Sequence, residues 1–353
     1  MKKPDWKVIA ASVAGAALVI MGAVSPANRD TSPSAETARP TADAGPASQG
    51  ISYHGGLAVE GTSLVDRHGQ PVQLRGVSSH GITWYPRYGE GPALATVRQA
   101  GANVFRIAMY TDGPGSYQDQ PEQSLAATTA AADRALAADL YAIIDWHTFG
   151  EKDPNVHLDQ AVDFFDRVSA AYRDQPGVIY EICNEPNGGT TWDDITRYAN
   201  QIIPVIRANS PDTVILVGTP SYSTGLAEAA AGPLDFPNIM YVYHFYADLS
   251  SGEYAGDISR ALAKGVPVFV SEWGIGNDHS PDQKTVEHLL DESRTFLDFL
   301  DTKSISWVSW SLSNKNEGSS LLRPDSESPN GWADKELTPY GQFVFARLRA
   351  GRA

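Results

Sequence analysis

Short runs of apolar, β-branched and aromatic residues recur along the chain from residue 72 onward, and longer stretches with helical periodicity separate them. Such runs, about four to eight residues long, are typical of buried strands, whereas apolar positions three and four apart indicate amphipathic helices. The pattern predicts eight strands, at residues 72–78, 103–110, 141–147, 178–185, 213–219, 239–246, 266–273 and 305–312.

Seven of these strands precede a stretch that predicts a helix, and the fifth precedes the least clear unit, residues 220–238. The helical stretches are 93–101, 124–139, 159–174, 192–209, 258–265, 286–303 and 339–350. Alternating strands and helices predict a parallel α/β architecture, and the continuous apolar character of the strands fits burial on both faces. Eight repeats favour a closed (β/α)8 TIM barrel over an open sheet, since no glycine-rich dinucleotide motif follows the first strand.

The segment before the first barrel strand predicts a short N-terminal β-hairpin. It reads LAVEGTSLVDRHGQPVQL (residues 57–74), and we expect its turn near His68 and Gly69. Residues 28–50 are rich in Pro, Ala, Ser and Thr without an apolar period, which predicts a disordered linker. The (β/α)8 domain is therefore expected at residues 51–353.

The first 27 residues predict a signal peptide. A basic start, MKKPDWK, precedes an uncharged apolar run at residues 8–24, and small residues follow it at 25–27. This order is typical of a secretory signal, with cleavage expected after Ala27. We therefore expect an extracellular protein. The alternative is an N-terminal membrane anchor, because the run is at the short limit of a spanning helix.

Composition and charge narrow the classes of partner. The chain has 353 residues, 42% of them hydrophobic and 20% charged, and a formal net charge of −15. So acidic a surface repels phosphate, which argues against nucleic acid and against anionic membrane once the signal is removed. It suits a neutral ligand. The single cysteine, Cys183, excludes an intramolecular disulfide, and we interpret it as a packing residue.

Polar and aromatic side chains gather where the predicted strands end. In a TIM barrel the active site lies at the carboxyl ends of the strands, so these side chains are expected to converge. They are His80, Arg106, Tyr110, Asp145, His147, Asn184, Glu185, His244, Tyr246, Glu272, Trp273 and Trp310. A barrel without chemistry needs far fewer polar residues at this end.

Two carboxylates, Glu185 and Glu272, end the fourth and seventh strands. Facing each other across the barrel mouth, they could cleave a glycosidic bond, one as acid and the other as nucleophile. The structural alternative is that each pairs with a basic neighbour, and Arg106 is available for one of them. The sequence has no HExxH, no paired cysteines, no G-x-S-x-G and no phosphate-binding loop, so we expect neither a metal nor a cofactor.

The motifs in order resemble glycoside hydrolase family 5, in particular its bacterial endoglucanase (cellulase) branch. They are LRGVSSHGITWYP, NVFRIAMYT, IIDWH, VIYEICNEPNG, YHFYA, VFVSEWG and WVSWSLSNKNEGSSLL. The resemblance implies a retaining endo-β-1,4-glucanase that acts on cellulose and soluble β-glucans. By match to NEP, Glu185 is the acid/base, and by match to SEWG, Glu272 is the nucleophile.

The resemblance also implies roles for the neighbouring residues. We expect Arg106 and Tyr246 to favour the ionised form of Glu272, Asn184 to bind the sugar 2-hydroxyl, and His147 and His244 to complete the network. The residues expected to bind substrate are His80, Trp84, Tyr85, Tyr110, Trp310, Lys315 and Glu317. Aromatic rings suit the apolar faces of pyranoses. Trp192 is a further candidate, and Trp307 is assigned to the core.

Other functions remain open from the sequence. A mannanase, xylanase or mixed-linkage glucanase would use the same catalytic centre on another glycan. An inactive carbohydrate-binding barrel is the alternative from another class, although both glutamates are intact. The expected partner is a β-glucan polysaccharide or oligosaccharide, and the protein is expected to be a monomer.

Overall fold

The computed structural model describes residues 49–250, 252–276 and 282–351. The predicted signal peptide and the linker residues 28–48 lie outside the described residues and stay predictions. Among the described residues, no helix has the length and apolar character needed to cross a membrane.

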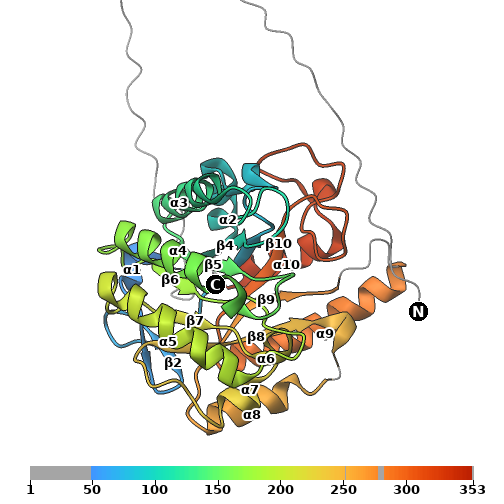
Figure 1. The fold of residues 1–353 in the computed structure, drawn as a ribbon. Coiled ribbons are helices and arrows are strands. Elements are labelled where there is room, and N and C mark those ends of the chain that lie inside the picture. The colour runs from blue at the N-terminus through green and yellow to red at the C-terminus, as the bar shows by residue number, and fades with distance from the viewer. Residues whose placement is uncertain (1–48, 251, 277–281, 352–353) are drawn as a thin grey trace, which may run out of the picture. The chain divides into compact units, whose positions relative to one another are not determined.

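Eight parallel strands close into a barrel (Figure 1). They are β3 (Arg75–Ser79), β4 (Val104–Tyr110), β5 (Tyr141–His147), β6 (Val178–Glu181), β7 (Ile215–Val217), β8 (Ile239–Tyr246), β9 (Val268–Gly274) and β10 (Trp307–Leu312). Neighbours in the sequence are neighbours in the barrel, and β10 closes it by pairing with both β9 and β3. The predicted (β/α)8 barrel is confirmed.

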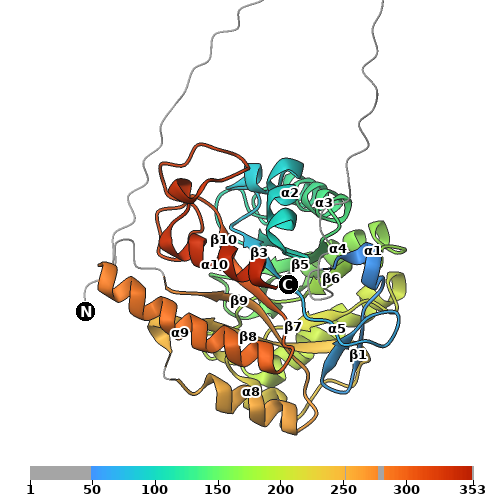
Figure 2. The ribbon, with the colours of Figure 1, turned by 180° about the vertical axis from the view of Figure 1, so that it is seen from behind.

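Helices surround the strands on all sides, as the two opposite views show (Figures 1 and 2). The long ones are α2 (Gly91–Ala100), α3 (Pro121–Ala137), α4 (Leu158–Ala171), α5 (Trp192–Asn209), α8 (Tyr254–Ala263), α9 (Gln283–Thr302) and α10 (Pro339–Ala350). Side-chain caps fix several starts, such as the Thr191–Asp194 capping box at α5. The unclear unit after the fifth strand forms two short helices, α6 (Pro220–Ser223) and α7 (Leu226–Ala229).

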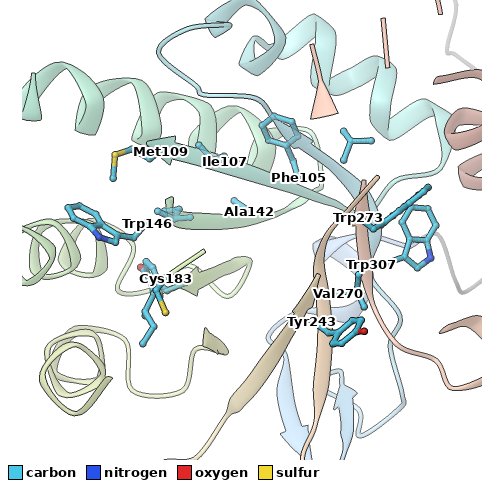
Figure 3. Packing of buried hydrophobic residues seen from close by; sticks show 14 of the residues in the cluster. Phe105, Ile107, Met109, Ala142, Trp146, Cys183, Tyr243, Val270, Trp273 and Trp307 are labelled. Carbon is cyan, nitrogen blue, oxygen red and sulfur yellow. The ribbon is translucent and has the colours of Figure 1, made fainter. Parts of the chain in front are cut away.

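The main core lies between the strands and this helical shell. Every second residue of a barrel strand faces outward into it, for example Phe105, Ile107 and Met109 on β4 and Trp146 on β5 (Figure 3). Trp307 belongs to the same core and packs edge-on against Trp273 at 6.0 Å, as expected of a core residue.

The N-terminal segment closes the amino end of the barrel. After α1 (Ile51–His54), β1 (Ala58–Glu60) and β2 (Ser63–Val65) form a two-stranded antiparallel sheet. Apolar side chains of this segment and of the approach to β3 pack against the inward residues at the amino ends of the strands, among them Val104, Tyr141, Val214 and Met240. Buried apolar surface of this kind keeps water out of the barrel interior.

The predicted hairpin exists, but the position of its turn was wrong. The chain reverses between Glu60 and Ser63, not at His68 and Gly69. His68 and Gly69 lie in a second turn, where the Gly69 amide donates to the Asp66 carbonyl and Val65 bridges to Pro71. His68-Gly69 does form a turn, as its sequence predicts. The turn that joins β1 to β2, however, is Gly61-Thr62, between the paired residues Glu60 and Ser63.

Candidate active site

The inward-facing side chains change from apolar to polar along several of the strands. On β5, Tyr141 and Ile143 face the apolar amino end, whereas Asp145 and His147 face the carboxyl end. On β4, Val104 is followed by Arg106 two residues later. Because side chains alternate with a period of two, a strand directs this whole series to the interior. The polar half of the barrel interior is therefore one connected site.

The strand β9 departs from this alternation at the site. Val242 of β8 pairs with Phe269, but His244 pairs with Glu272, so β9 contains one extra residue. The pairing of β10 with β9 shifts over the same stretch. Strict alternation would direct Ser271 and Glu272 to opposite faces. The irregularity instead lets both side chains contact the interior network, the usual effect of a bulge beside a functional site.

Glu185 and Glu272 meet at the barrel mouth. Glu185 follows β6, and Glu272 lies on β9 and is only 4% exposed. One carboxylate oxygen of each, together with a ring nitrogen of His244, lies within 4.8 Å of the others. A metal could bridge three such atoms, but Glu272 already accepts hydrogen bonds on both oxygens. The spacing suits two carboxyl groups that act on one bond.

Arg106 is the only guanidinium in this part of the described interior and is fully buried. Its Nη1 donates to Glu272 Oε2 at 3.0 Å, and its Nη2 donates to Asn184 Oδ1 at 2.6 Å. Tyr246 donates its hydroxyl to Glu272 Oε1 at 2.8 Å. Glu272 is thus held on both oxygens by donors, which favours its charged form and fixes its orientation.

Burial raises the pKa values of both glutamates, but different neighbouring charges act on each. Burial raises the pKa of Glu185 to about 7, with Arg106 opposing the rise and Glu181 adding to it. Burial also raises the pKa of Glu272, but His244 and Arg106 oppose the rise, while the nearby Glu185 adds to it. Because Glu272 has direct donors on both oxygens, we assign the charge to Glu272 and the proton to Glu185 near neutral pH.

His147 and Asn184 adjoin the glutamates. His147 Nδ1 lies 2.7 Å from Asp145 Oδ2, and its Nε2 lies 3.3 Å from Asn184 Nδ2. The Asn184 amide also donates to the Thr148 carbonyl, while its oxygen accepts from Arg106. These contacts orient Asn184 at the edge of the site. The structure therefore brings all seven predicted catalytic side chains into one network.

An aromatic wall lies beside this network. Tyr110 stacks on His80 with centroids 5.7 Å apart, and His147 stacks on Trp310 at 5.3 Å. Trp84 packs on Tyr110 at 4.3 Å and is 38% exposed, with its indole N–H bonded to the Pro114 carbonyl. Such a wall offers a rigid apolar surface to a flat ring.

Two loop residues after β10 extend the wall. Lys315 Nζ lies 2.6 Å from Glu317 Oε2 and 3.0 Å from His80 Nε2. Tyr85 lies beside them, half-buried, and packs on His80 at 5.1 Å. Trp192 does not join the site, because it is buried against Tyr241 and bonds the Gly232 carbonyl.

Comparisons with known proteins bear on this geometry. Residues 65–316 match the family model described as cellulase (glycosyl hydrolase family 5). The chain belongs to glycoside hydrolase family 5. It is 42% identical to an endoglucanase of Clostridium saccharobutylicum over 295 residues, which are 83% of this chain and 65% of that protein. It is 42% identical to endoglucanase A of Evansella cellulosilytica, over 80% of this chain and 57% of that one. The chain thus spans less than two thirds of these relatives.

Solved structures of family 5 have the same fold. Cellulase Cel5C_n is 36% identical, with a TM-score of 0.79 over 85% of this chain and 94% of that one. The catalytic domain of Thermobifida fusca endoglucanase Cel5A, solved with cellotetraose, is 33% identical, with a TM-score of 0.79 over 85% of this chain and 99% of that one. The resemblance seen in the motifs is therefore confirmed.

Two residues of this family 5 site, Glu181 and Ser271, were not among the predicted site residues, and Asp145 was expected at the barrel mouth without a role. Glu181 accepts from Arg106 Nε at 2.8 Å and Nη2 at 3.0 Å, and Asp145 lies 3.0 Å from Nη2. The alternation on β6 carried a signal, because Ile179 and Glu181 share a face and a buried carboxylate requires a partner. Ser271 follows the inward-facing Phe269 by two residues, so alternation on β9 carried a signal for it as well. The inward position of Glu272 is the one that depends on the irregularity in β9.

Proposed function

We propose that this chain is an exported endo-β-1,4-glucanase that hydrolyses internal bonds of cellulose and soluble β-glucans with retention of configuration. One observation carries the proposal: carboxylate oxygens of Glu185 and Glu272 lie within 4.8 Å of each other. Retaining glycosidases space their carboxyl groups by about 5–5.5 Å, whereas inverting ones need about 6.5–9.5 Å to admit a water. The family 5 relatives named endoglucanases support the linkage.

In the first step the Glu272 carboxylate attacks the anomeric carbon. The bond to the leaving oxygen breaks, and Glu185 transfers its proton to that oxygen. The leaving chain departs as an alcohol, the sugar remains as an ester of Glu272, and Glu185 becomes ionised. Arg106 and Tyr246 hold Glu272 in line for this attack.

In the second step a water replaces the leaving chain. Esterification removes the charge of Glu272, and with it the repulsion between the two carboxylates, so the pKa of Glu185 falls. The Glu185 carboxylate then takes a proton from the water as its oxygen attacks the anomeric carbon. The ester bond breaks, Glu272 is released as a carboxylate, and the product keeps its original configuration.

Substrate chains are proposed to bind on both sides of these glutamates. The wall formed by Trp84, Tyr110 and Trp310 suits pyranose rings on one side. Beside Glu185 a cleft of about 520 Å³ opens, and three exposed apolar side chains line it: Phe149, Tyr222 and Leu249. Since Glu185 protonates the leaving oxygen, this cleft is proposed to hold the leaving sugars. A larger hollow of about 650 Å³ lies at the amino ends of β6 and β7, away from the glutamates.

Anomer-resolved NMR of the first products from cellotetraose tests the proposal. We expect new reducing ends in the β configuration, appearing before mutarotation. New ends in the α configuration would show inversion and end the mechanism, and no cleavage of any glucan would favour the inactive binding barrel.

Reducing-sugar release from carboxymethylcellulose, barley glucan, glucomannan and xylan tests the glycan. We expect the two glucans to be the best substrates. Activity on glucomannan or xylan alone would reassign the substrate while keeping the catalytic centre. N-terminal sequencing of the exported product tests cleavage after Ala27, and an intact N-terminus would favour a membrane anchor.

A further inference from the structure

A buried chain of hydrogen bonds runs behind Glu185. Glu185 Oε1 lies 2.9 Å from His244 Nδ1, and His244 Nε2 lies 3.1 Å from Ser271 Oγ. Ser271 Oγ in turn lies 2.9 Å from Glu181 Oε1. His244, Ser271 and Glu181 are at most 3% exposed. Each donor and acceptor in this chain must therefore be matched inside the protein.

The direction of the bonds follows from the Glu181 end. Glu181 accepts from two nitrogens of Arg106, which can only donate, so Glu181 is held as an acceptor. Ser271 has one hydroxyl proton, and a bond to a carboxylate is stronger than one to a neutral ring nitrogen. The proton of Ser271 thus points to Glu181, and its oxygen is left to accept from His244 Nε2.

The tautomer of His244 then decides the contact with Glu185. A neutral imidazole has one N–H, so a proton on Nε2 leaves Nδ1 as an acceptor. The 2.9 Å contact with Glu185 Oε1 is then a hydrogen bond only if Glu185 carries the proton. Burial lowers the pKa of His244 to about 4 and raises that of Glu185 to about 7, which agrees with a proton on Glu185.

We infer that Ser271 is a positioning residue: it fixes the tautomer of His244, and through it keeps the acid Glu185 protonated. The inference rests on the proposed role of Glu185 as the acid/base. Ser271 faces the interior two residues after the inward-facing Phe269, and the extra residue of β9 brings Glu272 inside beside it. The charged and titratable groups facing the pair come from five strands, and they are Arg106, Tyr110, Asp145, His147, Glu181, Tyr246 and Glu272.

The variant Ser271→Ala tests the effect on catalysis. Without the hydroxyl, His244 is free to carry its proton on Nδ1 and to donate to an ionised Glu185. In the pH profile of kcat/KM for cellotetraose, the midpoint of the basic limb, where activity falls, should then move to lower pH by about one unit. A shift of that size corresponds to the free energy of about one hydrogen bond. Ser271→Thr, which keeps the hydroxyl, should move this limb back toward wild type.

Two controls separate this effect from others. Ser293→Ala removes another fully buried serine hydroxyl, bonded to the Leu289 carbonyl on α9, and should leave the limb unmoved. With 2,4-dinitrophenyl β-cellobioside, whose leaving group needs no proton, the basic limb should be weak in both wild type and Ser271→Ala. A wild-type limb that is equal for both substrates would instead refute Glu185 as the acid, and with it the proposed function.

Nitrogen-15 NMR of labelled histidine tests the tautomer directly in the wild-type protein. The His244 signals are assigned by their loss in His244→Asn, and we expect the proton on Nε2 at pH 6. A proton on Nδ1 in the wild type would overturn the inference even if Ser271→Ala does not fold. An unchanged tautomer and an unchanged basic limb in a folded Ser271→Ala would overturn it as well, and both outcomes leave the role of Glu185 intact.

Discussion

The two ends of the barrel interior are built by the same strands in opposite ways. At the amino end, residues such as Ile143, Leu216 and Val242 fill the barrel, and the N-terminal segment covers them. At the carboxyl end, the next inward positions of β4, β5 and β6 carry Arg106, Asp145 and Glu181 instead. A step of two residues along a strand thus leads from a buried apolar cluster to a cluster of charged side chains.

The difference shows which end serves stability. Apolar burial at the amino end lowers the free energy of the folded state directly. Buried charges cost solvation that their mutual attraction repays only with good geometry, so they are weak evidence for stability. One guanidinium faces three carboxylates at the carboxyl end, namely those of Asp145, Glu181 and Glu272. An excess of buried negative charge of this kind points to a chemical role for the carboxyl end rather than to a role in stability.

The largest expected effect is the loss of turnover in Glu272→Ala. Because the proposed nucleophile is removed, kcat should fall by about 10⁴-fold or more on every glycan, while the fold is kept. The measurement is the initial rate on barley glucan, with circular dichroism as the control for folding. Residual activity above about 1% of wild type would assign the nucleophile to another residue.

Glu185→Ala should have an effect that depends on the leaving group. With cellotetraose, kcat/KM should fall by about 10²–10⁴-fold, because the leaving oxygen needs a proton. With 2,4-dinitrophenyl β-cellobioside the first step should keep much of its rate, and a burst of dinitrophenol should precede slow hydrolysis. Equal losses with both substrates would contradict the role of Glu185 as acid.

Arg106→Met and Ile143→Ala compare the two ends directly. Removing Arg106 leaves buried carboxylates uncompensated and should lower the free energy of unfolding by about 3–5 kcal/mol at pH 7. At pH 5 the loss should be smaller, because the raised pKa values of Asp145, Glu181 and Glu272 let these groups hold protons. Urea unfolding at both pH values measures this.

The matched change at the amino end should not respond to pH. Ile143→Ala leaves a cavity among apolar side chains and should cost about 3 kcal/mol at pH 5 and at pH 7 alike. If both variants lost the same free energy of unfolding at both pH values, the two ends of the barrel would not differ in how charge contributes to stability.

The smallest expected effect is a gain of stability in Glu185→Gln. The pKa of Glu185 is raised to about 7 in the folded protein, so its contribution to stability is present below its ordinary pKa and is lost as pH rises through 7. A neutral glutamine avoids that loss, so the variant should be more stable than wild type by about 2 kcal/mol at pH 8 and equal to it near pH 4. Thermal melts from pH 4 to 8 measure the difference, which should not be constant.

Much of the fold followed from local patterns, and so did most of the site. The eight strands were predictable because a buried parallel strand must be apolar on both faces, and the strand-end glutamates stood out because a charge there needs a reason. The predicted turn of the N-terminal hairpin was wrong, since two turn signals lie seven residues apart and only the packed strands select between them.

By itself the sequence determined the order of strands and helices and the family, because alternation and motif order are properties of neighbours along the chain. Only the tertiary structure decided that Arg106 is shared among three carboxylates and that Ser271 and Glu272 both reach the interior. The physical reason is that hydrogen-bond partners come from strands far apart in the chain, and a one-residue irregularity in β9 changes which side chains meet.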